Sequence, residues 1–258
     1  MRWPSSIMLI RHDTSAYNVL KDKKRDHPLY KKFLGEFALD PESKKTKKLA
    51  DKVWKKFALG NGDAETELAD VDGRQAYETG LILAAEATPD VVFVSPYKRA
   101  PLTLHHLTRG WHALKGVEIV EEERVREQEH GLALLYSDWR VFHTLHSDQK
   151  QLHAMEGPYW YRYPQGENVP DVRKRNRDWI DALIRDFSKK RVLVVTHHLN
   201  ILAMRANLER WDANKFIEQD REEKPINCGV THYVGNPEGG RSGKGKLVLG
   251  YYNKRHYK

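Results

Sequence analysis

Hydrophobic residues along this chain fall into four short runs that are bounded by charged or turn residues. The runs cover residues 7–10, 91–94, 117–120 and 192–195. Short runs rich in Val and Ile are typical of strands that are buried on both faces of a sheet. The pattern therefore predicts four buried strands.

Between and after these runs, apolar residues recur at the spacing that is typical of amphipathic helices. Helices are predicted at residues 73–87, 98–111, 169–187 and 200–208. Strands that alternate with helices favour a mostly parallel sheet covered by helices on both faces. We therefore expect an α/β fold, a three-layer α/β/α sandwich, to which residues 230–234 and 246–252 add edge strands.

Three segments depart from this alternation. Residues 20–66 are rich in lysine, and residues 132–168 are rich in aromatic residues and histidine. Long connections of this kind usually carry function at the ligand edge of a sheet. We expect one domain over residues 1–258, with 20–66 as one insertion and 132–168 as a second that forms a lid. Residues 235–245 are rich in glycine and predict a flexible hairpin loop.

Composition narrows the class of protein. Hydrophobic residues make up 40% of the 258 residues and charged residues 31%, which is typical of a globular protein. No run approaches the ~20 apolar residues that span a membrane, and no signal-like segment precedes the first predicted strand. Cys228 is the only cysteine, so neither an intrachain disulfide nor a cysteine-based zinc site is expected. We predict a cytoplasmic protein that does not bind membranes.

The net charge of +8 is unevenly distributed. Residues 21–56 contain thirteen Lys or Arg against six Asp or Glu. A local positive field attracts anionic ligands, but a solvated lysine-rich surface has the same composition. We favour the solvated surface and do not expect nucleic acid to be the ligand.

Chemically active side chains follow three of the predicted strands. Arg11 and His12 end the first, Arg99 lies shortly after the second, and His197 follows the fourth. The carboxyl ends of parallel strands form one ligand edge, where Arg and His donors together bind a phosphate dianion. Glu127 and Glu129, after the third strand, can each protonate a leaving alkoxide. The sequence thus predicts a phosphate site with His12 as the candidate nucleophile.

The order of these motifs resembles the histidine phosphatase superfamily, also called phosphoglycerate mutase-like. The family pattern of Arg-His near the N-terminus followed by Asn matches Arg11, His12 and Asn18. Its Ser-Pro-x-x-Arg-Ala matches residues 95–100, and its second histidine at a strand end matches His197. The family acid stands four residues before a glycine, which selects Glu127 over Glu129. Residues 161–168 resemble the Gly-Glu-Ser segment of the fructose-2,6-bisphosphatase-like and broad-range phosphatases.

The resemblance implies a metal-independent phosphomonoester phosphatase that acts on a small phosphorylated metabolite through a phosphohistidine. His12 would attack phosphorus, and Glu127 would protonate the leaving oxygen and then activate water. The phosphoryl oxygens would be held by Arg11, Arg99 and a protonated His197. No metal or other cofactor is expected, because these cations neutralise the phosphate.

Further residues are candidates for contacts with the substrate. They are Asn18 and Ser15 near the phosphoryl group, His198, Tyr161 as a stacking or packing aromatic, and Arg162 for a second anionic group. Glu167 is expected to fix a loop. Asp13 stands where the family has glycine. If its carboxylate faced the phosphate, the two negative charges would repel each other; if it faced away, the carboxylate would orient a neighbouring residue.

Two other functions remain as alternatives. A cofactor-dependent phosphoglycerate mutase uses the same phosphohistidine, but residues 19–30 lack the Gly-Trp-x-Asp segment of the mutases. A non-catalytic protein would bind anions or nucleic acid through the basic insertion. His143, His146, His153 and Asp148 suggest a histidine-rich surface or lid rather than a metal site.

Overall fold

The computed structural model describes residues 3–240 and 245–258, which form a six-stranded mixed sheet in the order β3-β2-β4-β1-β5-β6. Four strands are parallel: β1 (Ser6–Arg11), β2 (Val91–Val94), β3 (Glu118–Glu121) and β4 (Arg191–Thr196). The antiparallel strands β5 (Val230–Asn236) and β6 (Lys246–Lys254) complete it. The predicted α/β fold is confirmed.

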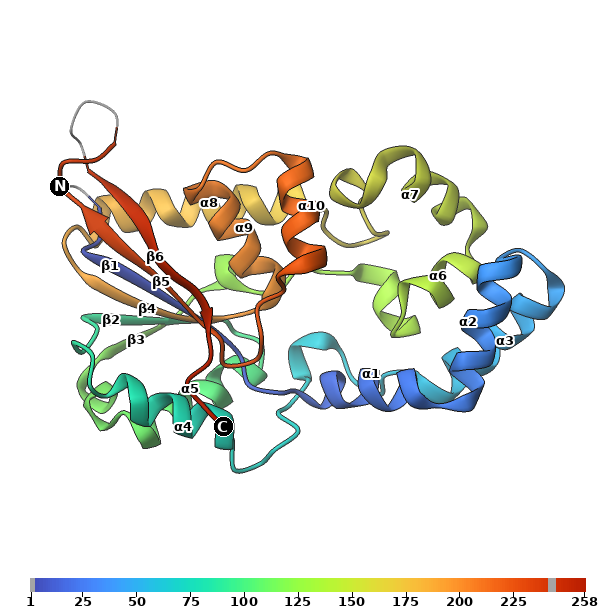
Figure 1. Ribbon diagram of the computed structural model, residues 1–258, viewed down its shortest axis with the longest axis horizontal. Helices are drawn as coiled ribbons and strands as arrows, with labels where there is room; N and C mark the ends of the chain where they lie inside the picture. Colours follow the sequence, from blue (N-terminus) through green and yellow to red (C-terminus); the bar gives the residue numbers. More distant parts are fainter. Residues whose placement is uncertain (1–2, 241–244) are drawn as a thin grey trace.

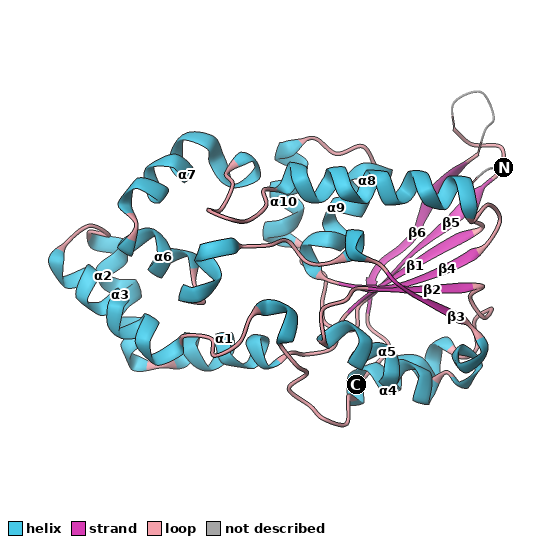
Figure 2. Ribbon diagram, turned by 180° about the vertical axis from the view of Figure 1, so that it is seen from behind, coloured by secondary structure: helices cyan, strands magenta, loops and turns pink. Residues whose placement is uncertain are grey.

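Helices cover both faces of the sheet, as Figure 2 shows. One face carries α4 (Arg74–Leu83) and α5 (Arg99–Gly110), and the other carries α8 (Val169–Asp186) and α9 (His198–Leu208), with α10 (Ala213–Glu222) packed against α9. Along β1, Met8 and Ile10 belong to the first core and Ile7 and Leu9 to the second. Burial on both faces explains why the central strands are apolar without alternation.

The prediction of four buried strands was wrong for the third. Three of the four residues of β3 are exposed, and Ile119 keeps 53% of its surface. The reason is its place at the edge of the sheet, where it pairs with β2 alone. The hairpin between β5 and β6 lies where it was predicted, although residues 241–244 of that loop are outside the described residues.

The two insertions are largely helical and pack against each other, which their loop-like composition did not predict. They contain most of α1 (Ala16–Asp26) and all of α2 (Pro28–Leu39), α3 (Lys44–Phe57), α6 (Trp139–Leu145) and α7 (Ser147–Trp160). We call these five helices the helical cap; they lie beyond the carboxyl ends of the parallel strands (Figure 1). The cap has its own core, in which Phe33, Val53 and Val141 are fully buried.

The lysines of α3 lie on the outer side of this core. In α3 the buried side chains recur at Thr46, Leu49, Ala50, Val53 and Phe57, and the intervening lysines are exposed. The aromatic rings of Tyr30 and Phe33 are buried as well, so they offer no platform on which bases could stack. This arrangement fits a solvated basic surface.

Short 3-10 helices complete the described structure. They are η1 (Asp63–Glu65), η2 (His112–Gly116), η3 (Glu123–Val125) and η4 (Gly131–Tyr136). In the part of the chain that is described, no helix is long and apolar enough to cross a membrane.

Candidate active site

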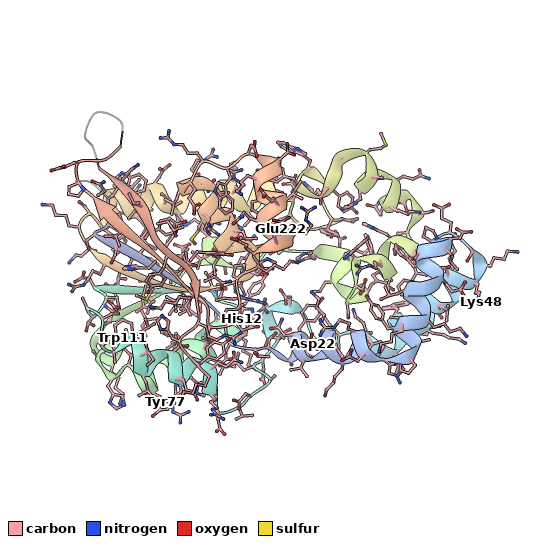
Figure 3. All side chains as sticks on the ribbon, in the orientation of Figure 1. His12, Asp22, Lys48, Tyr77, Trp111 and Glu222 are labelled. Carbon is pink, nitrogen blue, oxygen red and sulfur yellow. The ribbon has the colours of Figure 1, made fainter. Side chains whose placement is uncertain are left out.

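The loops after β1, β2 and β4 bring the predicted phosphate-binding residues to one edge of the sheet. Arg11 pairs with Thr196 across β1 and β4, so the next residues, His12 and His197, lie side by side with ring centroids 5.1 Å apart. Arg99 is the first residue of α5, directly after the loop that follows β2. Figure 3 shows His12 between the sheet and the helical cap.

His12 is held in one tautomer by the backbone. Its Nδ1 lies 2.6 Å from the carbonyl oxygen of Asp13, and a carbonyl only accepts, so Nδ1 carries the proton. Burial lowers the pKa of His12 well below its usual value, and the charges of Arg99 and Arg11 lower it further. A neutral imidazole with its lone pair on Nε2 results, which is the form that a nucleophile requires.

His197 is also neutral, and the protonated form expected from the sequence requires a bound dianion to raise its pKa. Burial, together with Arg99 and His12, holds its pKa well below the usual value. Its Nε2 lies 2.7 Å from the Ser95 hydroxyl, which accepts a hydrogen bond from the N–H of Tyr97 and can donate its own hydrogen to Nε2. Nδ1 of His197 is buried and has no partner among the described residues, and it carries the ring proton when Ser95 donates to Nε2.

The two arginines also have donors to spare. Arg11 gives one Nη1–H to the carbonyl oxygen of Pro225 at 2.8 Å, but its buried Nε–H has no partner in the described structure. Arg99 uses Nη1 and Nη2 to bind Asp63 and makes no hydrogen bond through Nε. A buried donor without an acceptor costs about 1–3 kcal/mol, so such donors beside a nucleophile indicate an anion site.

Glu127 is fixed near these groups by backbone donors. Its Oε1 accepts the N–H of Gln128 at 3.0 Å and that of Leu199, in the first turn of α9, at 3.1 Å. Its second oxygen makes no hydrogen bond within the described chain and is available to a substrate. Glu129 instead pairs with Arg126 near the surface.

The loop that carries Glu127 is held by Arg175. Its guanidinium donates to the carbonyl oxygens of Arg124, Arg126 and Glu127 at 2.7, 2.8 and 3.0 Å. Glu167 accepts from Arg175 at 3.0 and 3.1 Å, so it has the loop-fixing contacts that were predicted.

Asp13 faces away from the cavity described below. Its carboxylate accepts the N–H of Ala76, in the first turn of α4, at 3.0 Å and that of Thr14 at 2.6 Å. The N-cap of α4 is Gly73, which has no side chain, and Asp13 supplies the missing acceptor. Of the two orientations considered for Asp13, the structure has the one that orients a neighbour.

A cavity of about 770 Å³ opens between the sheet edge and the helical cap. Its walls include Arg11, His12, Arg99, Glu127, Ser15, Asn18 and His198, together with Lys21, Trp139 and Arg140 from the cap. Asn18 accepts through Oδ1 from the backbone N–H and the hydroxyl of Ser15, which leaves its Nδ2 free. Ser15 is the N-cap of α1, and its hydroxyl proton is committed to Asn18 rather than to a ligand.

Two predicted substrate contacts do not line this cavity. Tyr161 is 2% exposed and donates its hydroxyl hydrogen to Gln149, and Arg162 forms a surface ion pair with Asp171 at 2.5 Å. The connection between α7 and α8 turns these side chains away, and their neighbours Tyr159 and Tyr163 line the cavity.

Of the surface or lid predicted for the histidine-rich segment, the structure has a segment of the helical cap in which His143 is buried. His143 is 2% exposed and packs against the rings of Trp139, His153 and Tyr161. Among the described residues, no three His, Cys, Asp or Glu side chains are arranged to hold a metal ion.

Several residues of the site lie outside every motif and could not be found from the sequence. Asn227 donates to the carbonyl oxygen of His12 at 2.9 Å, and Asp220 of α10 lies 2.8 Å from Nε2 of His198. Asp63 binds Arg99, which lies 36 residues later in the sequence. None belongs to a motif, and each reaches the site through the folding of a distant segment.

Comparison with known proteins agrees with this geometry. Residues 52–242, more than half of the chain, match the histidine phosphatase superfamily (branch 1). Phosphoglycerate mutase-like protein AT74 of Arabidopsis thaliana is 29% identical over 164 residues, which cover 58% of this chain and 50% of that protein. Phosphoserine phosphatase 1 of Hydrogenobacter thermophilus is 24% identical over 168 residues, which cover 65% of this chain and 76% of that protein. The chain spans about half the length of AT74 and of its relative AT74H.

Solved structures with the same fold include a mycobacterial glucosyl-3-phosphoglycerate phosphatase in complex with VO3. It aligns with a TM-score of 0.64 and 17% identity over 96% of this chain and 99% of that one. Mycobacterial hydrolase 1 aligns with a TM-score of 0.67 and 17% identity over 97% of this chain and 99% of that one. Together with the match over residues 52–242, these similarities show that the chain belongs to branch 1 of the histidine phosphatase superfamily.

Proposed function

We propose that this protein is a metal-independent phosphomonoester phosphatase that works through a phosphohistidine at His12. The observation that carries the proposal is a neutral His12, with its lone pair on Nε2, beside unengaged N–H donors of Arg11, Arg99 and His197. Those donors match the equatorial oxygens of a phosphoryl group and stabilise their charge during transfer.

In the first step, Nε2 of His12 attacks phosphorus in line. A P–N bond forms, the bond between phosphorus and the leaving oxygen breaks, and the Glu127 carboxyl gives its proton to that oxygen. In the second step, water attacks phosphorus and the P–N bond breaks. Glu127 takes a proton from the water, and inorganic phosphate leaves.

The cavity favours a leaving group with an anionic group of its own. Seven Lys or Arg and four Asp or Glu side chains line it, so cations remain when the acids are balanced. Lys21 and Lys224 line the wall near Asp220 and form no ion pair with other residues of the described chain. A phosphorylated carboxylic acid or a bisphosphate would supply the missing charge. Phosphoserine and glucosyl-3-phosphoglycerate, named for two relatives, are esters of this kind.

The test is phosphate release from a panel of phosphomonoesters, in buffer with EDTA, by the wild type and by His12→Ala. We expect turnover by the wild type and a loss of at least ~10³-fold in the variant, since the nucleophile is gone. His105→Ala, an exposed histidine of α5, is the matched control and should retain activity. Equal rates in wild type and His12→Ala would contradict the mechanism.

The same panel separates the alternatives. A mutase would move the phosphoryl group between hydroxyls of phosphoglycerate faster than it releases phosphate. A non-catalytic binder would release none, and would instead bind nucleic acid with an affinity that falls steeply with salt.

A further inference from the structure

One short segment ties together the two loops that carry the candidate nucleophile and Arg99. It runs from residue 63 to residue 69, between α3 and α4. Ala16 donates to the carbonyl oxygen of Glu67 at 2.9 Å, and Ala69 donates to that of Thr14 at 2.8 Å. At its other end, Lys98 donates to the carbonyl oxygen of Ala64 at 2.8 Å. We call residues 63–69 the strap.

Asp63, at the start of the strap, binds Arg99 with three hydrogen bonds. Arg99 Nη1 donates to the Asp63 carbonyl oxygen at 2.7 Å and to Oδ1 at 3.0 Å, and Nη2 donates to Oδ2 at 3.1 Å. The side chains are 5% and 19% exposed, so water competes little for this pair. Carboxylate and guanidinium therefore meet in a bidentate, charge-assisted geometry.

Asp63 occupies the Nη1/Nη2 edge of the Arg99 guanidinium, and the Nε/Nη2 edge stays open. Asp63 takes both hydrogens of Nη1 and the hydrogen of Nη2 that lies beside Nη1. What remains is Nε–H and the second Nη2–H, which point the same way and make no hydrogen bond with the described residues. Such a fork matches two oxygens of a phosphoryl group. Asp63 does not have to leave for Arg99 to bind phosphate.

We propose that Asp63 is a positioning residue: it holds Arg99 by its Nη1/Nη2 edge, so that the Nε/Nη2 fork faces the phosphoryl group. This inference rests on the proposed function. Asp63 also links Arg99 to the helical cap, because Phe57, six residues earlier, packs in the cap core.

The opposite interpretation is a gate, in which Asp63 occupies the place of the phosphate and must be displaced. The two make opposite predictions for Asp63→Ala. Positioning predicts that kcat/KM falls ~10–100-fold and that inorganic phosphate inhibits more weakly, because Arg99 is no longer oriented. A gate predicts tighter phosphate inhibition and an unchanged or higher kcat.

The experiment measures kcat, KM and the inhibition constant of inorganic phosphate for the wild type, Asp63→Ala and Asp63→Asn. Asp63→Asn keeps one acceptor and should lose less than Asp63→Ala. Glu65→Ala, an exposed acid in the same 3-10 helix, is the matched control and should behave as the wild type. Thermal melts identify a variant that has lost its fold, and Asp63→Asn then provides the comparison.

A double-mutant cycle with Arg99→Ala asks whether Asp63 acts through Arg99. We expect Asp63→Ala to add little to the defect of Arg99→Ala. The inference would be overturned if the losses of the two single variants were additive. It would also be overturned if the Asp63 variants kept the wild-type kinetic constants or were inhibited more tightly by phosphate. Each of these outcomes would leave the phosphatase proposal intact. A wild type that neither releases nor binds phosphate would instead overturn both.

Discussion

Buried histidines are the residues whose charge this fold controls most tightly. His12, His143 and His197 are each at most 3% exposed, and burial is the largest cause that lowers the pKa of each. Burial disfavours the imidazolium form because no water solvates its charge. The motifs located two of these histidines, but their charge depends on surroundings that no motif encodes.

The pH dependence of stability follows from this burial. Burial lowers the pKa of His143 to about 4, from 6.5 in the unfolded chain. Between these values the unfolded state binds more protons, so stability falls as pH drops below 6.5. We expect the melting temperature to fall between pH 7 and pH 5, and to fall less in His143→Phe, which cannot be protonated. His105→Gln is the control, and an identical fall in wild type and His143→Phe would contradict the argument.

At the same scale, the site could be predicted where its side chains lie at strand ends or in family motifs. Arg11, Arg99 and His197 lie at or shortly after strand ends and were found as a set, and the motifs added Asn18 and Glu127. The carbonyl oxygens of Asp13 and Pro225, which set the tautomer of His12 and anchor Arg11, have no side-chain signature. Tyr161 and Arg162 were misplaced because their orientation depends on how a connecting segment turns.

At the scale of elements, the central strands could be predicted and the helical cap could not. Strands β1, β2 and β4 are buried on both faces, which leaves an unbroken apolar run in the sequence. The helical periodicity of α3 was present but hidden by lysine-rich composition. Helix α7 is interrupted at Gly157, and its apolar residues follow no single face.

The cap is joined across its two insertions by a buried ion pair. Lys24 of α1 lies 3.1 Å from Asp138, the N-cap of α6, and donates to the Ser137 carbonyl oxygen at 2.5 Å. Tyr30 donates to the same Asp138 oxygen at 2.5 Å. These side chains are buried, so each depends on the others for its hydrogen bonds.

Removing one partner of this pair should loosen the cap. We expect Lys24→Met to leave the Asp138 charge buried and to destabilise the cap by about 3–5 kcal/mol. Hydrogen exchange should then rise in α1, α2 and α6 and stay unchanged in α4 and α5. Lys24→Met combined with Asp138→Asn should recover part of the protection. Lys23→Met, at an exposed neighbouring position, is the control; uniform exchange in all variants would contradict this role.

At the scale of the whole molecule, the cavity belongs to neither the sheet nor the cap alone. The sheet edge supplies the candidate phosphate-binding groups, the cap supplies Lys21, and the segment before β5 supplies Lys224. Burial and the charge of Lys224 lower the pKa of Lys21, so an anion between the two ammonium groups would relieve their repulsion.

Substrate choice should follow from these two lysines. We expect higher kcat/KM for phosphoesters with a second anionic group than for neutral esters of similar size. Lys21→Ala and Lys224→Ala should each raise KM for the anionic esters about 5–10-fold and leave KM for the neutral esters unchanged. The size of the effect follows from the loss of one partly solvated charge contact of about 1 kcal/mol. Lys23→Ala is the control. Equal effects on both classes of ester would assign these lysines another role.

The strand order has a consequence for how the protein is made. Strand β1 ends directly before His12 and lies between β4 and β5, which begin at residues 191 and 230. Both neighbours of the strand that presents the candidate nucleophile therefore emerge from the ribosome long after it. Contacts so distant in sequence are slow to form. A nascent chain that ends before residue 191 has no native sheet partner for β1 and cannot hold His12 beside His197, so the candidate active site is assembled only at a late stage of synthesis.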